Sequence, residues 1–114
     1  MNDRELLELA AKAAKYWIVG PAEKYVAQLG HYEGGFIIRN DRGGDSCWNP
    51  LTDDGDALRL AVKCRLDINQ GGSMVVSERT GPQEVGVAEP HNDDPYAATR
   101  RAIVRAAAEI GKNV

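Results

Sequence analysis

Apolar side chains near the start of the chain recur at steps of three and four residues. The positions concerned are Leu6, Leu9, Ala10, Ala13 and Trp17. This spacing predicts an amphipathic helix whose apolar stripe faces a core. Asn2 can cap that helix, and Glu5 can complete a capping box by reaching back to the N–H of the cap. Gly20 and Pro21 are expected to end the helix, because proline has no N–H to continue it.

The pattern is weaker in the region that follows the first helix. Residues 23–29 fit a short helix and an alternating strand about equally, with a slight preference for the strand. A pair of glycines then permits a turn before residues 36–39, whose aromatic and β-branched side chains are typical of a buried strand. Residues 40–45 are polar and rich in glycine, which predicts a loop.

A second helix is predicted over residues 54–64. Thr52 or Asp53 can cap it, and the aspartates of its first turn place negative charge where the helix dipole favours it. Its inward face is expected to contain Ala57, Leu58, Ala61, Val62 and Cys64. Trp48 lies at the loop-to-helix junction beside a proline. We expect its ring to be buried and its N–H hydrogen-bonded, so that it anchors the junction.

The clearest hairpin follows the second helix. Alternating apolar and polar side chains over Leu66–Gln70 predict one strand, and a turn with two glycines leads into a second strand, Met74–Arg79. Another turn, at Gly81 and Pro82, precedes a third strand, Val85–Ala88. Adjacent strands with short connections imply an antiparallel meander.

The last helix has the strongest boundary signals. Asp94 can cap it, and Pro95 suits the first helical position, where a missing N–H has no cost. Gly111 and Lys112 mark its end. One face of it contains Tyr96, Thr99, Ile103, Ala107 and Ile110.

Together these elements predict a single domain over residues 1–114, with the order α-β-α-β-β-β-α. The fold class is α+β, with a mainly antiparallel β-sheet packed with three α-helices in an α/β/α-type sandwich. A length of 114 residues suits one core, and 43% hydrophobic with 27% charged residues is typical of a globular chain. The expected core contains Leu6, Ile38, Trp48, Leu58, Ile68, Val76, Val87 and Ile103.

Composition and charge narrow the classes of function. The formal net charge of -3 repels phosphate backbones and anionic lipid surfaces, so a nucleic-acid role would need a local basic face. No apolar run approaches the roughly 20 residues that span a bilayer, and the first residues lack the pattern of a secretory signal. We therefore expect a protein of the cytoplasm that has no membrane partner.

The sequence predicts no catalytic, metal or cofactor site. The run Asp53-Asp54-Gly55-Asp56 lacks the spacing of a calcium loop, and helix capping explains it better than a cation site. His91-Asn92-Asp93-Asp94 could bind a metal or form a general base, but loop solvation and capping explain each of its residues. Cys47 and Cys64 lie outside any Cys-x-x-Cys spacing, so we interpret them as buried thiols.

Basic side chains are the most serious candidates for a binding site. They are Arg59, Lys63, Arg100, Arg101 and Arg105. Arg101 and Arg105 lie four residues apart on one helix and repel each other, which contact with an acidic partner would relieve. A solvated helix surface is the simpler explanation, because Arg105 can pair with Glu109 one turn later.

Two long segments resemble a known family. They are Trp48–Lys63, which spans the junction and the second helix, and Asp94–Gly111, the last helix. Both are similar to segments of a family of small, functionally uncharacterised bacteriophage and prophage proteins, described as a phage α/β/α sandwich domain. The resemblance implies a phage or prophage origin, a bacterial host cell and helices packed on a central sheet. It assigns no catalytic residue.

The absence of a catalytic pattern, taken with this resemblance, favours a binding function. We expect a non-enzymatic accessory protein that binds a host or phage protein. The alternative is a nucleic-acid-binding accessory protein that uses Arg100, Arg101 and Arg105 on the last helix. A homodimer is compatible with either function.

Overall fold

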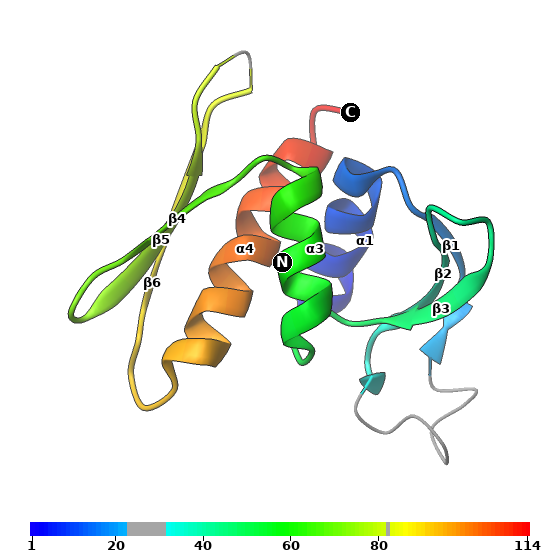
Figure 1. Ribbon diagram of the computed structural model, residues 1–114, viewed down its shortest axis with the longest axis horizontal. Helices are drawn as coiled ribbons and strands as arrows, with labels where there is room; N and C mark the ends of the chain where they lie inside the picture. The colour runs from blue at the N-terminus through cyan, green and yellow to red at the C-terminus, as the bar shows by residue number, and fades with distance from the viewer. Residues whose placement is uncertain (23–31, 82) are drawn as a thin grey trace.

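The computed structural model describes residues 1–22, 32–81 and 83–114. Within these residues, three helices form a layer between two three-stranded sheets (Figure 1). The α+β class and the predicted order of elements are confirmed, except that three strands stand where the sequence predicted one before the second helix. The predicted strand or helix at residues 23–29 lies outside the described residues.

The first sheet consists of β1 (Trp17–Pro21), β2 (Phe36–Arg39) and β3 (Asp45–Trp48). β2 lies in the middle and pairs antiparallel with both neighbours. Residues 40–44 form the turn between β2 and β3, as the predicted loop required. The third strand was missed because it begins with polar residues that continue the composition of the turn.

The second sheet is the predicted meander. It consists of β4 (Asp67–Gln70), β5 (Met74–Arg79) and β6 (Val85–Pro90), all antiparallel, with β5 in the middle. We expected all strands to share one central sheet, and this expectation was wrong. The chain passes through a helix between the two meanders, and each meander then packs on its own side of the helical layer (Figure 1).

The first helix, α1 (Asp3–Ala14), begins with the predicted capping box. The Glu5 backbone N–H donates to the Asn2 side chain at 2.9 Å, and the Asn2 N–H donates back to the Glu5 carboxylate at 3.3 Å. The helix ends earlier than we expected, because Lys15 adopts the left-handed conformation with φ 62° and closes the last turn. Trp17 therefore belongs to β1, and its side chain is 73% exposed.

The second described helix, α3 (Asp54–Lys63), is capped by Asp53, whose carboxylate accepts from the Asp56 N–H at 2.8 Å. Its buried stripe consists of Ala57, Leu60, Ala61 and Cys64. Leu58 and Val62 were expected to face inward, but they are 65% and 68% exposed. The buried stripe follows steps of three and four residues from Ala57, and these steps exclude both positions.

The last helix, α4 (Pro95–Gly111), is capped by Asp94 with proline at its start, as predicted. It has two buried faces. One face packs against α1, α3 and the first sheet through Ile103, Val104, Ala107 and Ile110. The other packs against the second sheet through Ala98, Ala102 and Ala106, which meet Val75 and Val87. The small alanines allow sheet and helix to approach closely.

Most of the predicted core is confirmed. Ile38, Trp48, Val87 and Ile103 are buried, while Leu6 and Ile68 are partly buried and pack against the core. Besides Leu58, the exception is Val76, which is only half-buried. In β5 the side chains of Val75 and Ser77 face the helices instead. Because Val75 and Val76 are adjacent, the sequence does not decide which of them faces the helices. A shift by one residue exchanges the two faces of a strand.

Candidate functional site

The five basic residues predicted as partner contacts all form ion pairs within the chain. Their partners are Asp56 for Arg59 at 2.8 Å, Asp41 for Lys63 at 2.7 Å, Asp54 for Arg100 at 2.7 Å, Asp3 for Arg101 at 3.0 Å and Glu89 for Arg105. Acidic side chains from distant parts of the chain thus relieve the repulsion between Arg101 and Arg105. Glu109, the expected partner of Arg105, pairs with Lys112 instead. The positive charge of each of these residues is therefore paired with an acidic side chain of the same chain.

The acidic run at the start of α3 serves the helix and the junction before it. Asp56 is buried, and its carboxylate accepts from the Asn49 backbone N–H at 3.0 Å and from Arg59 at 2.8 Å. Burial raises the pKa of Asp56 above its ordinary value of 3.8, while both hydrogen bonds oppose this rise. The three aspartates therefore have structural roles in capping and in pairing, as the sequence favoured.

Replacing Asp56 with asparagine should remove the contribution that titration of this carboxyl makes to the pH dependence of the unfolding free energy. Because the folded-state pKa of Asp56 is raised, this group stabilises the fold fully below pH 3.8, and the contribution is lost as the pH rises through the folded-state pKa. The unfolding free energy of the wild type minus that of Asp56→Asn should therefore decrease with pH across this window. Urea melts at a series of pH values measure the difference. An increase with pH would contradict this assignment.

The histidine loop and the cysteines show no reactive arrangement. His91 shares a hydrogen bond of 2.9 Å between its Nε2 and the side chain of Gln70, and Asp94 caps α4. No group of three or more potential ligands is placed to hold a metal ion in residues 1–22, 32–81 and 83–114. Cys47 and Cys64 are free thiols, and burial raises the pKa of each. A raised pKa lowers the thiolate fraction, so these thiols are poor nucleophiles.

A groove of about 470 Å³ lies between α3, α4 and β4. Most of its lining residues are apolar: Ala57, Leu58, Ala61, Ile68, Tyr96 and Ile103, beside the polar Asp54, Gln70, Thr99 and Arg100. We call this surface the apolar groove. Its polar edge is held in place by the chain itself, because Arg100 bonds both Asp54 and the Leu51 carbonyl, the latter at 2.8 Å. These contacts fix the polar edge of the groove.

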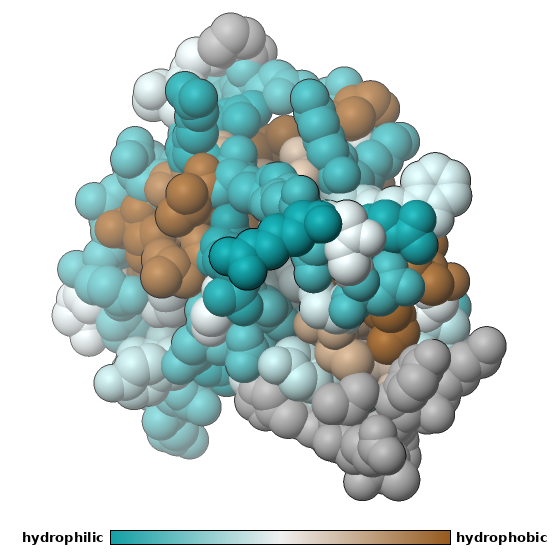
Figure 2. All heavy atoms as spheres, turned by 45° about the vertical axis from the view of Figure 1, so that its right-hand side comes forward, coloured by the Kyte–Doolittle hydropathy of each residue, from teal (hydrophilic) through white to brown (hydrophobic). Residues whose placement is uncertain are grey.

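Large apolar side chains in and beside this groove are exposed. Leu58 and Val62 project from α3, and Tyr96, which is 71% exposed, projects from α4. Figure 2 shows apolar side chains gathered at the surface on the left of its view. A cluster of this kind marks a contact surface more often than isolated exposed residues do. We expected both Leu58 and Val62 on the inward face of the second helix. The signal in the sequence was that α3 carries more apolar positions than one buried stripe needs.

Comparison with known proteins finds no relative of this chain. No family model matches the chain, and neither a curated protein nor a solved structure matches it. None of the helices in the described part of the chain has the length and the apolar character needed to cross a bilayer. These comparisons assign no function to the chain.

Proposed function

We propose that this chain is a non-enzymatic accessory protein, of phage or prophage origin, that binds a host or phage protein through the apolar groove. The observation that carries the proposal is the exposure of Leu58 and Tyr96, which line the apolar groove, and of Val62, which lies four residues after Leu58 on α3. The resemblance of two segments to a phage family supports the origin. The bound element is an amphipathic helix of the partner.

The shape of the groove favours a helix as its occupant. Two helices and one strand form its walls, and Leu58 and Val62 lie four residues apart, so they form a ridge along α3. Such ridges pack into the grooves between side chains of another helix. A helix with apolar residues at steps of three and four would place them in the apolar groove, while Asp54 and Arg100 would contact its polar margin.

The size of the exposed surface argues for a partner segment rather than a stable second copy. The three large side chains expose at most a few hundred Å², since even an aromatic residue contributes about 150–250 Å². A stable interface between folded proteins buries about 800 Å² on each partner. A single helix that docks in a groove makes contact through a few anchor side chains at helical spacing.

Leu58→Glu is expected to reduce partner binding by about tenfold or more, since a charge in an apolar contact removes a central anchor. Its stability should change by less than about 0.5 kcal/mol because the side chain is exposed. The experiment compares recovery of the partner from host lysate by the wild type and by this variant. Val19→Glu is the matched control, because Val19 is exposed on β1 in the other sheet. Equal recovery by all three proteins would exclude the groove.

Site-specific photocrosslinking identifies what occupies the groove. Benzoylphenylalanine replaces Leu58, and the crosslinked peptides are sequenced. The proposal requires a segment of another protein with apolar residues at helical spacing, whose synthetic peptide becomes helical when the wild-type chain is added. Crosslinks to a second copy of this chain would show self-association and overturn the proposal, and so would a segment that binds in an extended form.

Nucleic-acid binding through Arg100, Arg101 and Arg105 is the alternative. A phosphate backbone would have to displace Asp54, Asp3 and Glu89 from their ion pairs, which reduces the gain from each contact. A gel-shift titration separates the two functions. A shift that weakens steeply with salt and is lost in Arg101→Glu would favour the alternative, whereas no shift at low salt would exclude it.

A further inference from the structure

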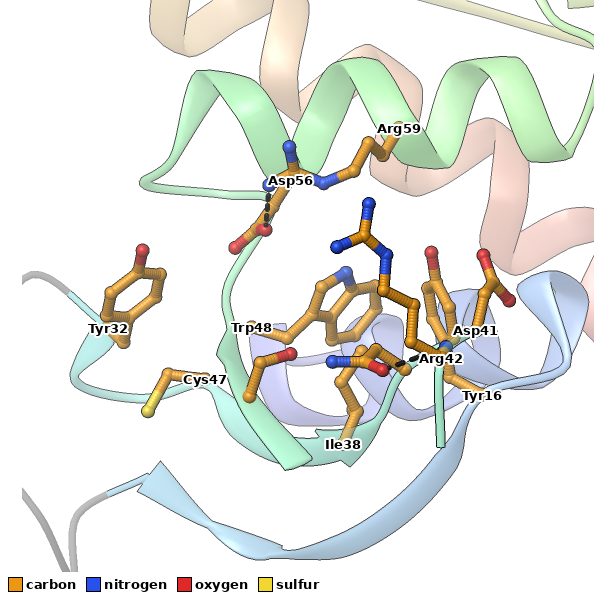
Figure 3. A pocket seen from close by; sticks show the side chains of 11 residues that line it. Tyr16, Tyr32, Ile38, Asp41, Arg42, Cys47, Trp48, Asp56 and Arg59 are labelled. Carbon is orange, nitrogen blue, oxygen red and sulfur yellow. Dashed lines mark hydrogen bonds and ion pairs between the residues drawn. The ribbon is translucent and has the colours of Figure 1, made fainter. Parts of the chain in front are cut away.

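A second pocket, of about 420 Å³, lies apart from the apolar groove, where the turn between β2 and β3 faces α3 (Figure 3). Aromatic and polar side chains from distant parts of the chain line it. Tyr16 follows α1, Asp41 and Arg42 belong to the turn, Trp48 ends β3, and Arg59 projects from α3. The volume lies within the range of about 300–1,000 Å³ that is usual for small-molecule sites.

The acidic groups of this pocket already have cationic partners. The Asp56 carboxylate accepts from Arg59 at 2.8 Å, and Asp41 pairs with Lys63 at 2.7 Å. The neighbouring Asp53 caps α3 and also lies 3.9 Å from Arg59. The pocket therefore offers no unpaired carboxylate that would attract a cation.

Two donors in the pocket lack a partner in the part of the chain that the structure describes. The first is the indole Nε1–H of Trp48, a side chain that is 2% exposed. The second is the guanidinium of Arg42, an exposed residue that forms no ion pair with the described residues, unlike Arg59. Figure 3 shows the Arg42 side chain extending from the turn into the pocket, and the nitrogen edge of Trp48 facing it.

The two donors match the same kind of ligand. A buried N–H without an acceptor is unfavourable by about 1–3 kcal/mol, so an acceptor that enters the pocket gains from meeting it. A guanidinium presents a planar fork of donors that matches the oxygens of a carboxylate or a phosphate. An oxyanion satisfies the indole and the guanidinium together, whereas a cation or a purely apolar ligand satisfies neither.

We propose that this pocket binds a small organic oxyanion, with Arg42 as its charge partner and the Trp48 indole N–H as a hydrogen-bond donor. The carboxylate or phosphate group of the ligand lies at these two residues. The ring of Tyr16 borders the space for the rest of the molecule. This binding site is independent of the apolar groove and of the function proposed for it.

The two tryptophans of the chain provide an internal control for the test. Their indole N–H groups give separate resonances in the nitrogen–proton spectrum of labelled protein, and Trp17 is exposed on β1, in the first sheet. Inorganic phosphate and benzoate are titrated separately at constant ionic strength. The resonance of Trp48 should shift and saturate with at least one of them, while that of Trp17 stays in place.

Arg42→Gln should weaken this binding by about tenfold or more, because it removes a charge-assisted contact. Arg39→Gln is the matched control, since Arg39 lies next to the same turn and pairs with Asp45 at 3.2 Å. It should leave the titration unchanged, as should Leu58→Glu in the apolar groove. A spectrum without ligand that stays unchanged away from the substituted residue verifies that each variant folds.

The pattern of responses decides the proposal. If the shift of the Trp48 resonance saturates with phosphate alone, the ligand is a phosphate, and if it saturates with benzoate alone, the ligand is a carboxylate. Either result supports the site. If the Trp48 resonance does not shift with either anion, the proposal is wrong. It is also wrong if Arg42→Gln binds the anion with the same affinity as the wild type. Shifts of both indole resonances that grow linearly would mean an adventitious ion only and would also overturn it.

Discussion

Replacing Trp48 with alanine is expected to lower the free energy of unfolding by about 3–5 kcal/mol. The side chain is almost fully buried at the end of β3, and it joins a core cluster with residues of α1, β2, α3 and α4. Its ring meets that of Tyr16 edge-on, with 5.8 Å between the ring centroids. Alanine would leave a cavity where several elements meet, and neighbours cannot fill it without moving the helices.

Urea melts of the wild type and of Trp48→Ala measure this loss. Trp17→Ala is the matched control, because it removes the same side chain from an exposed position of β1. The control should change stability by less than about 0.5 kcal/mol. A loss below about 1 kcal/mol for Trp48→Ala, outside the range for a buried tryptophan, would refute its role as an anchor.

The junction after Trp48 is held by its neighbour as well. The Asn49 backbone N–H donates to Asp56 at 3.0 Å, and its side chain donates to the Glu33 carbonyl at 3.1 Å and accepts from the Leu51 N–H at 3.0 Å. We expected the Trp48 N–H to be bonded too, but it has no partner within the described residues. Burial of the ring and the hydrogen bonds of Asn49 therefore fix the junction. The indole N–H is not needed there, so it can donate to the oxyanion proposed for the pocket.

Local signals predicted the ends of the helices and the second meander well. The box of Asn2 and Glu5 and the caps Asp53 and Asp94 act within three residues of each other along the chain, so the sequence contains all of their partners. The hairpin of β4 and β5 is equally local, since a short turn joins its strands. Such features depend little on the rest of the fold.

Arrangements that join distant segments could not be predicted in the same way. Neither the separation into two sheets nor the second buried face of α4 has a local signal, because three alanines fit a buried face and an exposed one equally well. The parity of β5 depends on the helix against which it packs. The first sheet contains a strand with polar residues that only its pairing with β2 defines.

The candidate sites show the same division. The basic residues were recognisable, but the partner of Arg101 is Asp3, at the opposite end of the chain, and no spacing rule connects them. Leu58 and Val62 were recognised as apolar, whereas their exposure follows from the position of α3 beside α4. The pocket at Trp48 combines residues from α1, a turn, β3 and α3, so only the folded chain brings them together.

The packing of α1 against α4 depends on a glycine at the end of α4. A Cβ atom built on Gly111 would lie 2.8 Å from the carbonyl carbon of Leu9 and closer still to its oxygen. Both are backbone atoms of α1, which cannot rotate away as a flexible side chain can. The two helices therefore approach each other at a distance that only glycine permits.

Gly111→Ala is accordingly expected to destabilise the fold by about 3 kcal/mol, because the helices must separate to admit one methyl group. This sign is opposite to the usual one, since alanine in place of glycine within a helix normally stabilises by up to about 1 kcal/mol. Urea melts measure the change in the free energy of unfolding. A loss of stability is expected only because α1 and α4 lie so close together at this glycine.

Gly55→Ala provides the comparison that isolates this cause. Gly55 also lies in a helix, α3, but a Cβ atom there would meet only side-chain atoms, the guanidinium of Arg59 at 3.2 Å and the carboxylate of Asp53 at 3.3 Å. The substitution should leave stability unchanged or raise it by up to about 1 kcal/mol. If Gly111→Ala behaved like Gly55→Ala, then α1 and α4 would not be in the close contact described. A loss confined to Gly111 would instead establish that the helical layer is built on the approach of these two backbones.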